Sequence, residues 1–159
     1  MTQPPSYIFD QTQHLKERTR LQAIEKIFDP ATERRLLGTG LKSGWRCLEI
    51  GPGAGSIMRW LGQTVGESGK VVAVDINPRF LEDEQSPRIE VVKSDIQSFE
   101  TETKFDLIHA RYVLIHIPDY EKAFRKMMSL LKPGGWIVLE EPDFSAAKMT
   151  SLCRAVPPE

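Results

Sequence analysis

The residues best suited to chemistry lie in one short stretch, where an acid precedes three alternating glycines. Glu49 is followed by Gly51, Gly53 and Gly55, and the apolar run 47–50 leads into them. A strand, a glycine-rich turn and a helix in this order form a ligand-binding corner of an α/β sheet. The glycines could also serve only a tight turn, but three in alternation after an acid favour ligand binding. The stretch therefore predicts a small-molecule site.

The spacing of these glycines distinguishes two classes of ligand. A nicotinamide or flavin site has glycines in the pattern G-x-G-x-x-G. Here the third position is Ser56, and the glycine falls one residue earlier, at Gly55. A dinucleotide seats its pyrophosphate at the helix N-terminus that follows such a turn. The early glycine therefore disfavours a dinucleotide.

Five apolar runs, which alternate with helical or polar segments, are expected to position this corner. The expected strands are 46–50, 71–75, 89–92, 105–109 and 136–140. The expected helices between them are about 54–65, a short one that begins at Asn77 and Pro78, and one from Pro118 to about 131. Unbroken apolar runs indicate parallel strands that are covered on both faces, and the crossovers are right-handed. The fold class is therefore α/β, a doubly wound, three-layer, Rossmann-like and mostly parallel sheet.

A helical extension is expected before the first strand. Residues 11–28 show helical spacing of apolar side chains, and Asp29 and Pro30 then suit the N-cap and first position of a second helix. We expect residues 1–43 to form this extension, as a cover for the sheet or for the mouth of the site. Residues 44–159 then form the Rossmann-like domain.

Composition sets the broad class of the protein. The chain has 159 residues, a formal net charge of -1 and two cysteines without metal-ligand spacing. We therefore expect no metal site and no nucleic-acid partner. No signal peptide is apparent, and no apolar run approaches the roughly 20 residues that span a bilayer. A cytoplasmic protein without a membrane span is the expectation.

The stretch 49–55 resembles the first motif of class I S-adenosylmethionine-dependent methyltransferases, and the likeness extends over about 44–141. Among these, the small-molecule enzymes of the ubiquinone and menaquinone biosynthesis type are the most similar. The resemblance implies that Glu49 acts near the cofactor's ammonium, that Asp75 accepts both ribose hydroxyls, and that Asp95 accepts the adenine amine. The cofactor-binding residues implied in this way are Glu49, Gly51, Pro52, Gly53, Gly55, Asp75, Ile76, Asn77, Ser94, Asp95, Ile96, Ala110 and Arg111.

Several of these residues also have a purely structural interpretation. Asp75 could cap a helix, and Asp95 could shape an ordinary turn. Arg111 could pair with a surface acid or steer a carboxylate of the ligand. Tyr7, Arg18 and Arg20 could close over that carboxylate, but a solvated helix face explains the two arginines better.

The function that the resemblance implies is methyl transfer from S-adenosylmethionine to a small-molecule acceptor, which the sequence does not identify. No catalytic residue is assigned. Tyr112 and His116 are candidate general bases because they follow the fourth strand at the catalytic edge. His116 could equally be a structural histidine. The alternative is a binding-only or degenerate module without turnover, and an NAD-dependent oxidoreductase is a third choice.

The C-terminal part departs from the family pattern, in which seven strands are expected. Residues 141–159 could supply a helix at about 144–154, but not two further strands. We therefore expect an incomplete domain with five of the seven strands. Its fifth strand would have an open edge, through which the chain could associate with itself.

Overall fold

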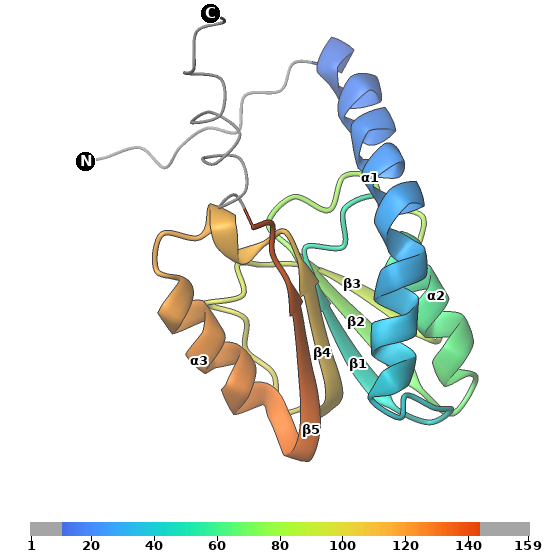
Figure 1. Cartoon of the computed structure of the whole chain (residues 1–159), viewed down its shortest axis with the longest axis vertical. Coiled ribbons are helices and arrows are strands. Elements are labelled where there is room, and N and C mark those ends of the chain that lie inside the picture. The colour runs from blue at the N-terminus through green and yellow to red at the C-terminus, as the bar shows by residue number, and fades with distance from the viewer. Residues whose placement is uncertain (1–10, 144–159) are drawn as a thin grey trace, which may run out of the picture.

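The computed structural model describes residues 11–143, and both Tyr7 and the helix expected at 144–154 lie outside them. Figure 1 shows the longer helices arranged around one sheet. In chain order the elements are α1 (Gln11–Gly38), β1 (Arg46–Ile50), α2 (Ser56–Val65), β2 (Lys70–Asp75), β3 (Ile89–Lys93), β4 (Phe105–Arg111), the 3-10 helix η1 (Leu114–His116), α3 (Tyr120–Leu130) and β5 (Leu131–Glu140).

The sheet has the order β3-β2-β1-β4-β5, and every neighbouring pair is parallel. This confirms the doubly wound α/β fold. From β1 the chain first builds the sheet outward through β2 and β3, and it then returns to the other side of β1 to add β4 and β5. In such a sheet a crevice forms beyond the carboxyl ends of the central strands. Glu49 of β1 lies level with Ala73 of β2 and His109 of β4.

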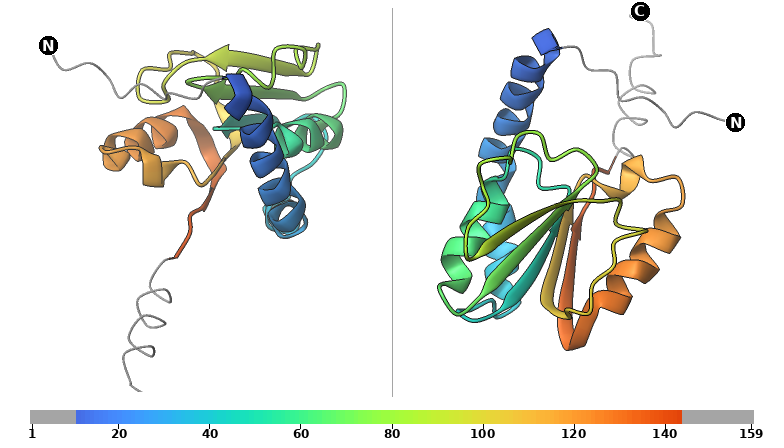
Figure 2. Two further views of the ribbon diagram at one scale, coloured as in Figure 1. Left: turned by 90° about the horizontal axis from the view of Figure 1, so that it is seen from above. Right: turned by 180° about the vertical axis from the view of Figure 1, so that it is seen from behind.

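Helices cover both faces of the sheet, as the two views of Figure 2 show. On one face, Leu36 of α1 and Met58 and Leu61 of α2 pack in one buried cluster with Cys47 and Val71 of the sheet. On the other face, three residues of α3 with helical spacing, Ala123, Met127 and Leu130, pack with further strand residues. The continuous apolar strands follow from this double cover, because both of their faces are buried.

The N-terminal extension is one helix rather than two. Pro30 lies inside α1, and Asp29 does not serve as an N-cap. A proline removes one backbone donor, but Pro30 is exposed and the helix continues past it. Leu36 packs in the core, but its neighbour Leu37 faces away from the sheet and is 52% exposed.

Two connections also differ from expectation. Residues 77–87 form turns and bends, so the helix expected at Asn77 and Pro78 is absent. Strand β5 begins at Leu131 rather than Trp136, with a register shift opposite Phe105 and Leu107. The Lys-Pro-Gly-Gly stretch is therefore an irregular part of the strand. Across residues 11–143, none of the helices is both apolar and long enough to cross a bilayer.

Candidate functional site

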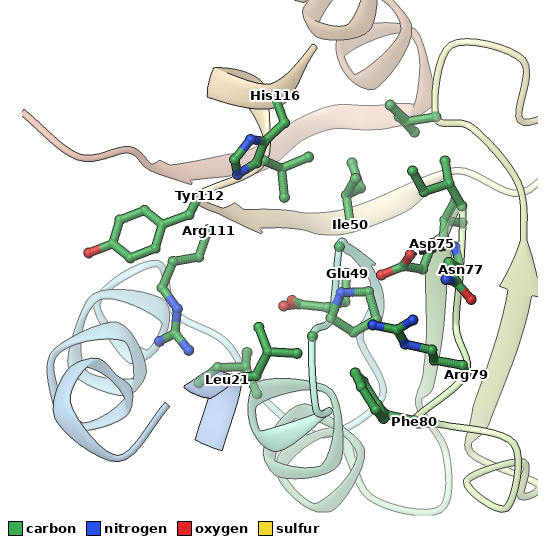
Figure 3. Close-up of a pocket in the computed structure, with 18 of the residues that line it drawn as sticks. Leu21, Glu49, Ile50, Asp75, Asn77, Arg79, Phe80, Arg111, Tyr112 and His116 are labelled. Atoms are coloured by element: carbon green, nitrogen blue, oxygen red, sulfur yellow. Dashed lines mark hydrogen bonds between the residues drawn. The ribbon is translucent and has the colours of Figure 1, made fainter. Parts of the chain in front are cut away.

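A cavity of about 600 Å³ opens at the carboxyl ends of the central strands, between the glycine turn, the β4 exit and α1. Figure 3 shows side chains from these elements turned toward it. Its wall includes the predicted residues Glu49, Gly51, Pro52, Gly53, Asp75, Ile76, Asn77, Ser94, Asp95, Ile96, Arg111, Tyr112 and His116. Two predicted residues are not part of this wall. Gly55 is the N-cap of α2, and Ala110 is fully buried in the core.

The glycine turn needs glycine for two separate reasons. The φ angles of Gly51, Gly53 and Gly55 are 63°, 62° and 91°, a region that other residues rarely adopt. A Cβ at Gly51 would also lie 2.5 Å from Cγ2 of Val113, which follows the neighbouring strand β4. The turn is therefore pressed closely against the β4 exit, and its backbone lines the cavity.

Two aspartates, at the end of β2 and just after β3, are oriented by backbone N–H groups two residues later in the chain. Oδ1 of Asp75 accepts a 2.7 Å hydrogen bond from the Asn77 N–H, and Oδ1 of Asp95 accepts one of 2.9 Å from the Gln97 N–H. Burial raises the pKa of Asp75, and this increase is partly offset by the hydrogen bond from the Asn77 N–H and by the charge of Arg79. Each carboxylate, which lines the cavity, is thus held in a fixed direction through one of its oxygens.

Glu49 belongs to a buried chain of charged groups behind the cavity. Its Oε2 lies 2.7 Å from Nδ1 of His109, whose Nε2 lies 3.3 Å from Oε1 of Glu140. Burial opposes charge on the His109 ring, but Glu49 and Glu140 outweigh it and raise the pKa of His109 to about 9. Burial also opposes ionisation of Glu140, yet hydrogen bonds from His109 and Thr32 lower its pKa. The ring is therefore an imidazolium that donates to both carboxylates near neutral pH.

Helix α1 contributes a wall that sequence reasoning largely missed. Oε1 of Glu25 accepts hydrogen bonds from the backbone N–H groups of Ala54 (3.0 Å) and Ser56 (3.4 Å). Glu25 is 8% exposed, and burial raises the pKa of its carboxyl against these hydrogen bonds. In the sequence, Glu25 lies four residues after Leu21, which lines the same cavity, and nothing else distinguishes it. Arg20, assigned to a solvated face, also lines the cavity, near its partner Glu17.

Arg111, at the end of β4, is tied to the same helix. Its Nη2 donates to Oδ1 of Asp29 at 2.8 Å, and its Nη1 donates to the Thr32 hydroxyl at 2.9 Å. Arg35 of α1 pairs with Oε2 of Glu140 at 2.7 Å. Arg111 therefore pairs with a partly buried acid of α1, while its side chain also lines the cavity. A role toward a carboxylate of the ligand stays a prediction.

The two candidate bases differ in their surroundings. Tyr112 has a φ of 58°, and its N–H donates to the Glu140 carbonyl at 2.8 Å. Its ring meets the Phe28 ring edge-on, with 5.5 Å between centroids. His116 is exposed at the end of η1, and Figure 3 shows its ring on the opposite side of the cavity from Leu21. A strained backbone at such an edge often accompanies a functional site.

Residues 13–156 match a family model described as a methyltransferase domain. The ubiquinone/menaquinone biosynthesis C-methyltransferase UbiE of Cronobacter sakazakii is 31% identical over 112 residues, which are 65% of this chain and 45% of that protein. The same enzyme of Pseudomonas paraeruginosa is 30% identical over 74% of this chain and 48% of its own length. The chain thus spans about half the length of the curated relatives it matches.

Among solved structures, the N-methyltransferase NodS from Bradyrhizobium japonicum, in complex with S-adenosyl-L-homocysteine, is similar with a TM-score of 0.59. It is 27% identical, and the match covers 70% of this chain and 61% of NodS. A SAM-dependent methyltransferase from Aquifex aeolicus shares the fold, with a TM-score of 0.62 at 24% identity, over 86% of this chain and 77% of that one.

Proposed function

This chain belongs to the methyltransferase domain family, whose cofactor is S-adenosylmethionine, and we propose that its cavity binds this cofactor for methyl transfer to a small-molecule acceptor. The observation that carries the proposal is the convergence of Glu49, Asp75 and Asp95 with the glycine turn on one cavity. These acids come from the ends of three neighbouring strands. They supply acceptors for an ammonium, a ribose and an adenine amine, and the turn offers close backbone approach.

The donor and acceptor properties of the wall fit this ligand. A sulfonium and an ammonium are cationic, and the wall has more acids than cations. Its five carboxylates, those of Glu17, Glu25, Glu49, Asp75 and Asp95, outnumber its four cationic side chains, those of Arg20, Arg79, Lys93 and Arg111. Ile76, Phe80 and Ile96 line the same cavity and provide apolar contact for a purine ring. We assign Glu49 to the ammonium because His109 holds one of its oxygens and so fixes the direction of the other.

The bound cofactor supplies an activated methyl group on a sulfonium, so the protein needs to align the acceptor and exclude water. We propose that the acceptor enters at the β4 exit, between Tyr112 and His116. His116 is the better candidate for a base, because it presents an exposed imidazole at the cavity, and histidine is the side chain that most often transfers protons in catalysis. The relatives named as quinone-biosynthesis C-methyltransferases make carbon acceptors the first class to assay.

Calorimetry with S-adenosylmethionine, S-adenosylhomocysteine and NAD tests cofactor binding directly. We expect both sulfur-containing ligands to bind and NAD to give no heat. Binding of NAD alone would overturn the proposal in favour of an oxidoreductase.

A methyl-release assay over carbon, oxygen and nitrogen acceptors then tests turnover. Cofactor binding without transfer to any of them would favour the binding-only module. His116→Gln should slow transfer more than it weakens cofactor binding, and equal effects on both would remove His116 from the role of base.

A further inference from the structure

Glu25 places a carboxylate at the N-terminus of helix α2, beside the glycine turn. Helix α2 begins at Ser56, its N-cap Gly55 has no side chain to cap it, and its first turn contains no acid. Oε1 of Glu25, from a helix about 30 residues earlier in the chain, accepts the N–H groups of Ala54 and Ser56. The protein therefore supplies its own anion to the N-terminus of α2.

We propose that Glu25 is a specificity-determining residue that excludes phosphate-bearing nucleotides from the glycine turn. The proposal rests on the proposed binding of S-adenosylmethionine in the same cavity. It adds a reason, independent of the glycine spacing, why an adenosine ligand without phosphates is accepted there.

The exclusion follows from geometry and charge. A pyrophosphate that follows an adenosine binds through the N–H groups at the start of the helix after the turn. Here a carboxylate that is 8% exposed already holds two of these donors, so a phosphate would have to displace it or lie against it. Like charges at such short range, in a partly desolvated site, repel strongly.

The arginine beside the glycine turn, Arg59, is already engaged by other acceptors. Nη1 of Arg59 lies beside the turn, but it donates to the Ala54 carbonyl at 3.0 Å and to Oε1 of Glu84 at 2.7 Å. Glu49, which lines the same cavity, adds a second carboxylate. A cationic ligand end is therefore attracted by the groups that repel a phosphate.

The test compares adenosine with ADP, because the two ligands differ only in the pyrophosphate. Calorimetric dissociation constants are measured for the wild type, Glu25→Gln and Glu25→Ala. Gln keeps an oxygen acceptor for both N–H groups but removes the charge, whereas Ala leaves both donors open. The matched control is Glu33→Gln, which removes one carboxylate from the same helix outside the cavity wall.

We expect the wild type and Glu33→Gln to bind ADP more weakly than adenosine. In Glu25→Gln the affinity for ADP should rise by about tenfold relative to adenosine, and in Glu25→Ala it should rise further. Adenosine itself should bind all four proteins within about threefold. If Glu25→Ala does not fold, Glu25→Gln decides the question, because it retains the cap.

An unchanged ADP-to-adenosine ratio in the Glu25 variants would overturn the proposal, as would wild-type protein that binds ADP more tightly than adenosine. Failure of the proposed function looks different, since adenosine and S-adenosylhomocysteine would then bind none of the proteins. In that case calorimetry on the same four proteins is repeated with inorganic pyrophosphate instead of ADP. Pyrophosphate binding that appears only in the Glu25 variants would support the role of Glu25, and its absence there would overturn it.

Discussion

The two sides of the cavity are held in place by different kinds of interaction. On the side of β1, β2 and β3, backbone conformation sets the shape, through left-handed glycines and aspartates that hydrogen-bond two residues ahead. On the side of β4, β5 and α1, ionised side chains set it, and their partners are far apart in sequence. Glu49 and His109 are 60 residues apart, and Arg35 and Glu140 are 105 apart.

The difference predicts how each side responds to change. A backbone-defined wall depends on which residues can adopt its angles, and its glycine turn, residues 51–55, carries no titratable side chain. A wall built from buried charges depends on every partner being present and ionised, because an unpaired buried charge is costly. The following experiments separate the two sides, beginning with the largest expected effect.

Removing His109 should disturb the charged side most. His109→Leu would leave Glu49 as a buried carboxylate without its donor and Glu140 with Arg35 as its remaining charged partner. It should lower the free energy of unfolding by about 3–5 kcal/mol. Urea denaturation measures this. His116→Leu is the matched control, since an exposed histidine should change stability by less than about 0.5 kcal/mol. Similar losses in both variants would show that the buried chain is not the cause.

Gly51→Ala should disturb the backbone side by a smaller amount. The left-handed φ costs about 1–2 kcal/mol for a residue with a Cβ, and the conflict with Val113 adds about 1–3 kcal/mol. Gly40→Ala isolates the first part, because Gly40 has a φ of 88° and a Cβ there would meet nothing within 4 Å. Gly51→Ala combined with Val113→Ala should recover part of the loss. If Gly51→Ala and Gly40→Ala cost the same, the turn is not pressed against the β4 exit.

The pH dependence of stability should come from the charged side. Because the pKa of His109 is raised above its ordinary 6.5 to about 9, its contribution is complete below pH 6.5 and is lost as the pH rises through 9. The loss is at most about 3 kcal/mol. Unfolding by urea at several pH values from about 6 to 10 measures it, and His109→Gln supplies the background from other groups. A wild-type profile that parallels the variant would contradict the charged state of His109.

The smallest expected effect is on ligand affinity at the backbone side. Asp75→Ala should weaken binding of S-adenosylhomocysteine by about 1–3 kcal/mol, because hydrogen-bond donors of the ligand lose their acceptor. Asp83→Ala, in the same β2–β3 connection but outside the cavity wall, is the control. Calorimetry that finds equal affinity for wild type and Asp75→Ala would remove Asp75 from the site.

The sequence predicted the backbone side well because its signals are local. Glycine spacing and an acid at a strand end are visible within a few residues, so Gly51 and Asp75 could be named in advance. Glu49, which precedes the glycines, is the one member of the charged side with the same local signal. Their roles toward the cofactor stay predictions. The fold itself followed from apolar runs that only a doubly covered parallel sheet explains.

The charged side could not be predicted in the same way. His109 could face either direction until the register placed it between Glu49 and the end of β5. Glu25 lay in a helical pattern that gave no indication of its contact with a turn about 30 residues away. Pro30 suggested a helix start, yet the tertiary contacts of Asp29 and Thr32 on either side of it favour one continuous helix.

The contacts of α1 have a consequence for how this helix can sit on the sheet. Glu25, Asp29, Thr32 and Leu36 follow one another at steps of four, three and four residues, so they lie on one face. An apolar stripe can slide along its groove by a turn and still remain buried. Directional hydrogen bonds cannot, because a slip of about 5.4 Å would break all of them together. These hydrogen bonds thus specify a single position of helix α1 along the sheet, and we expect them to form or break together.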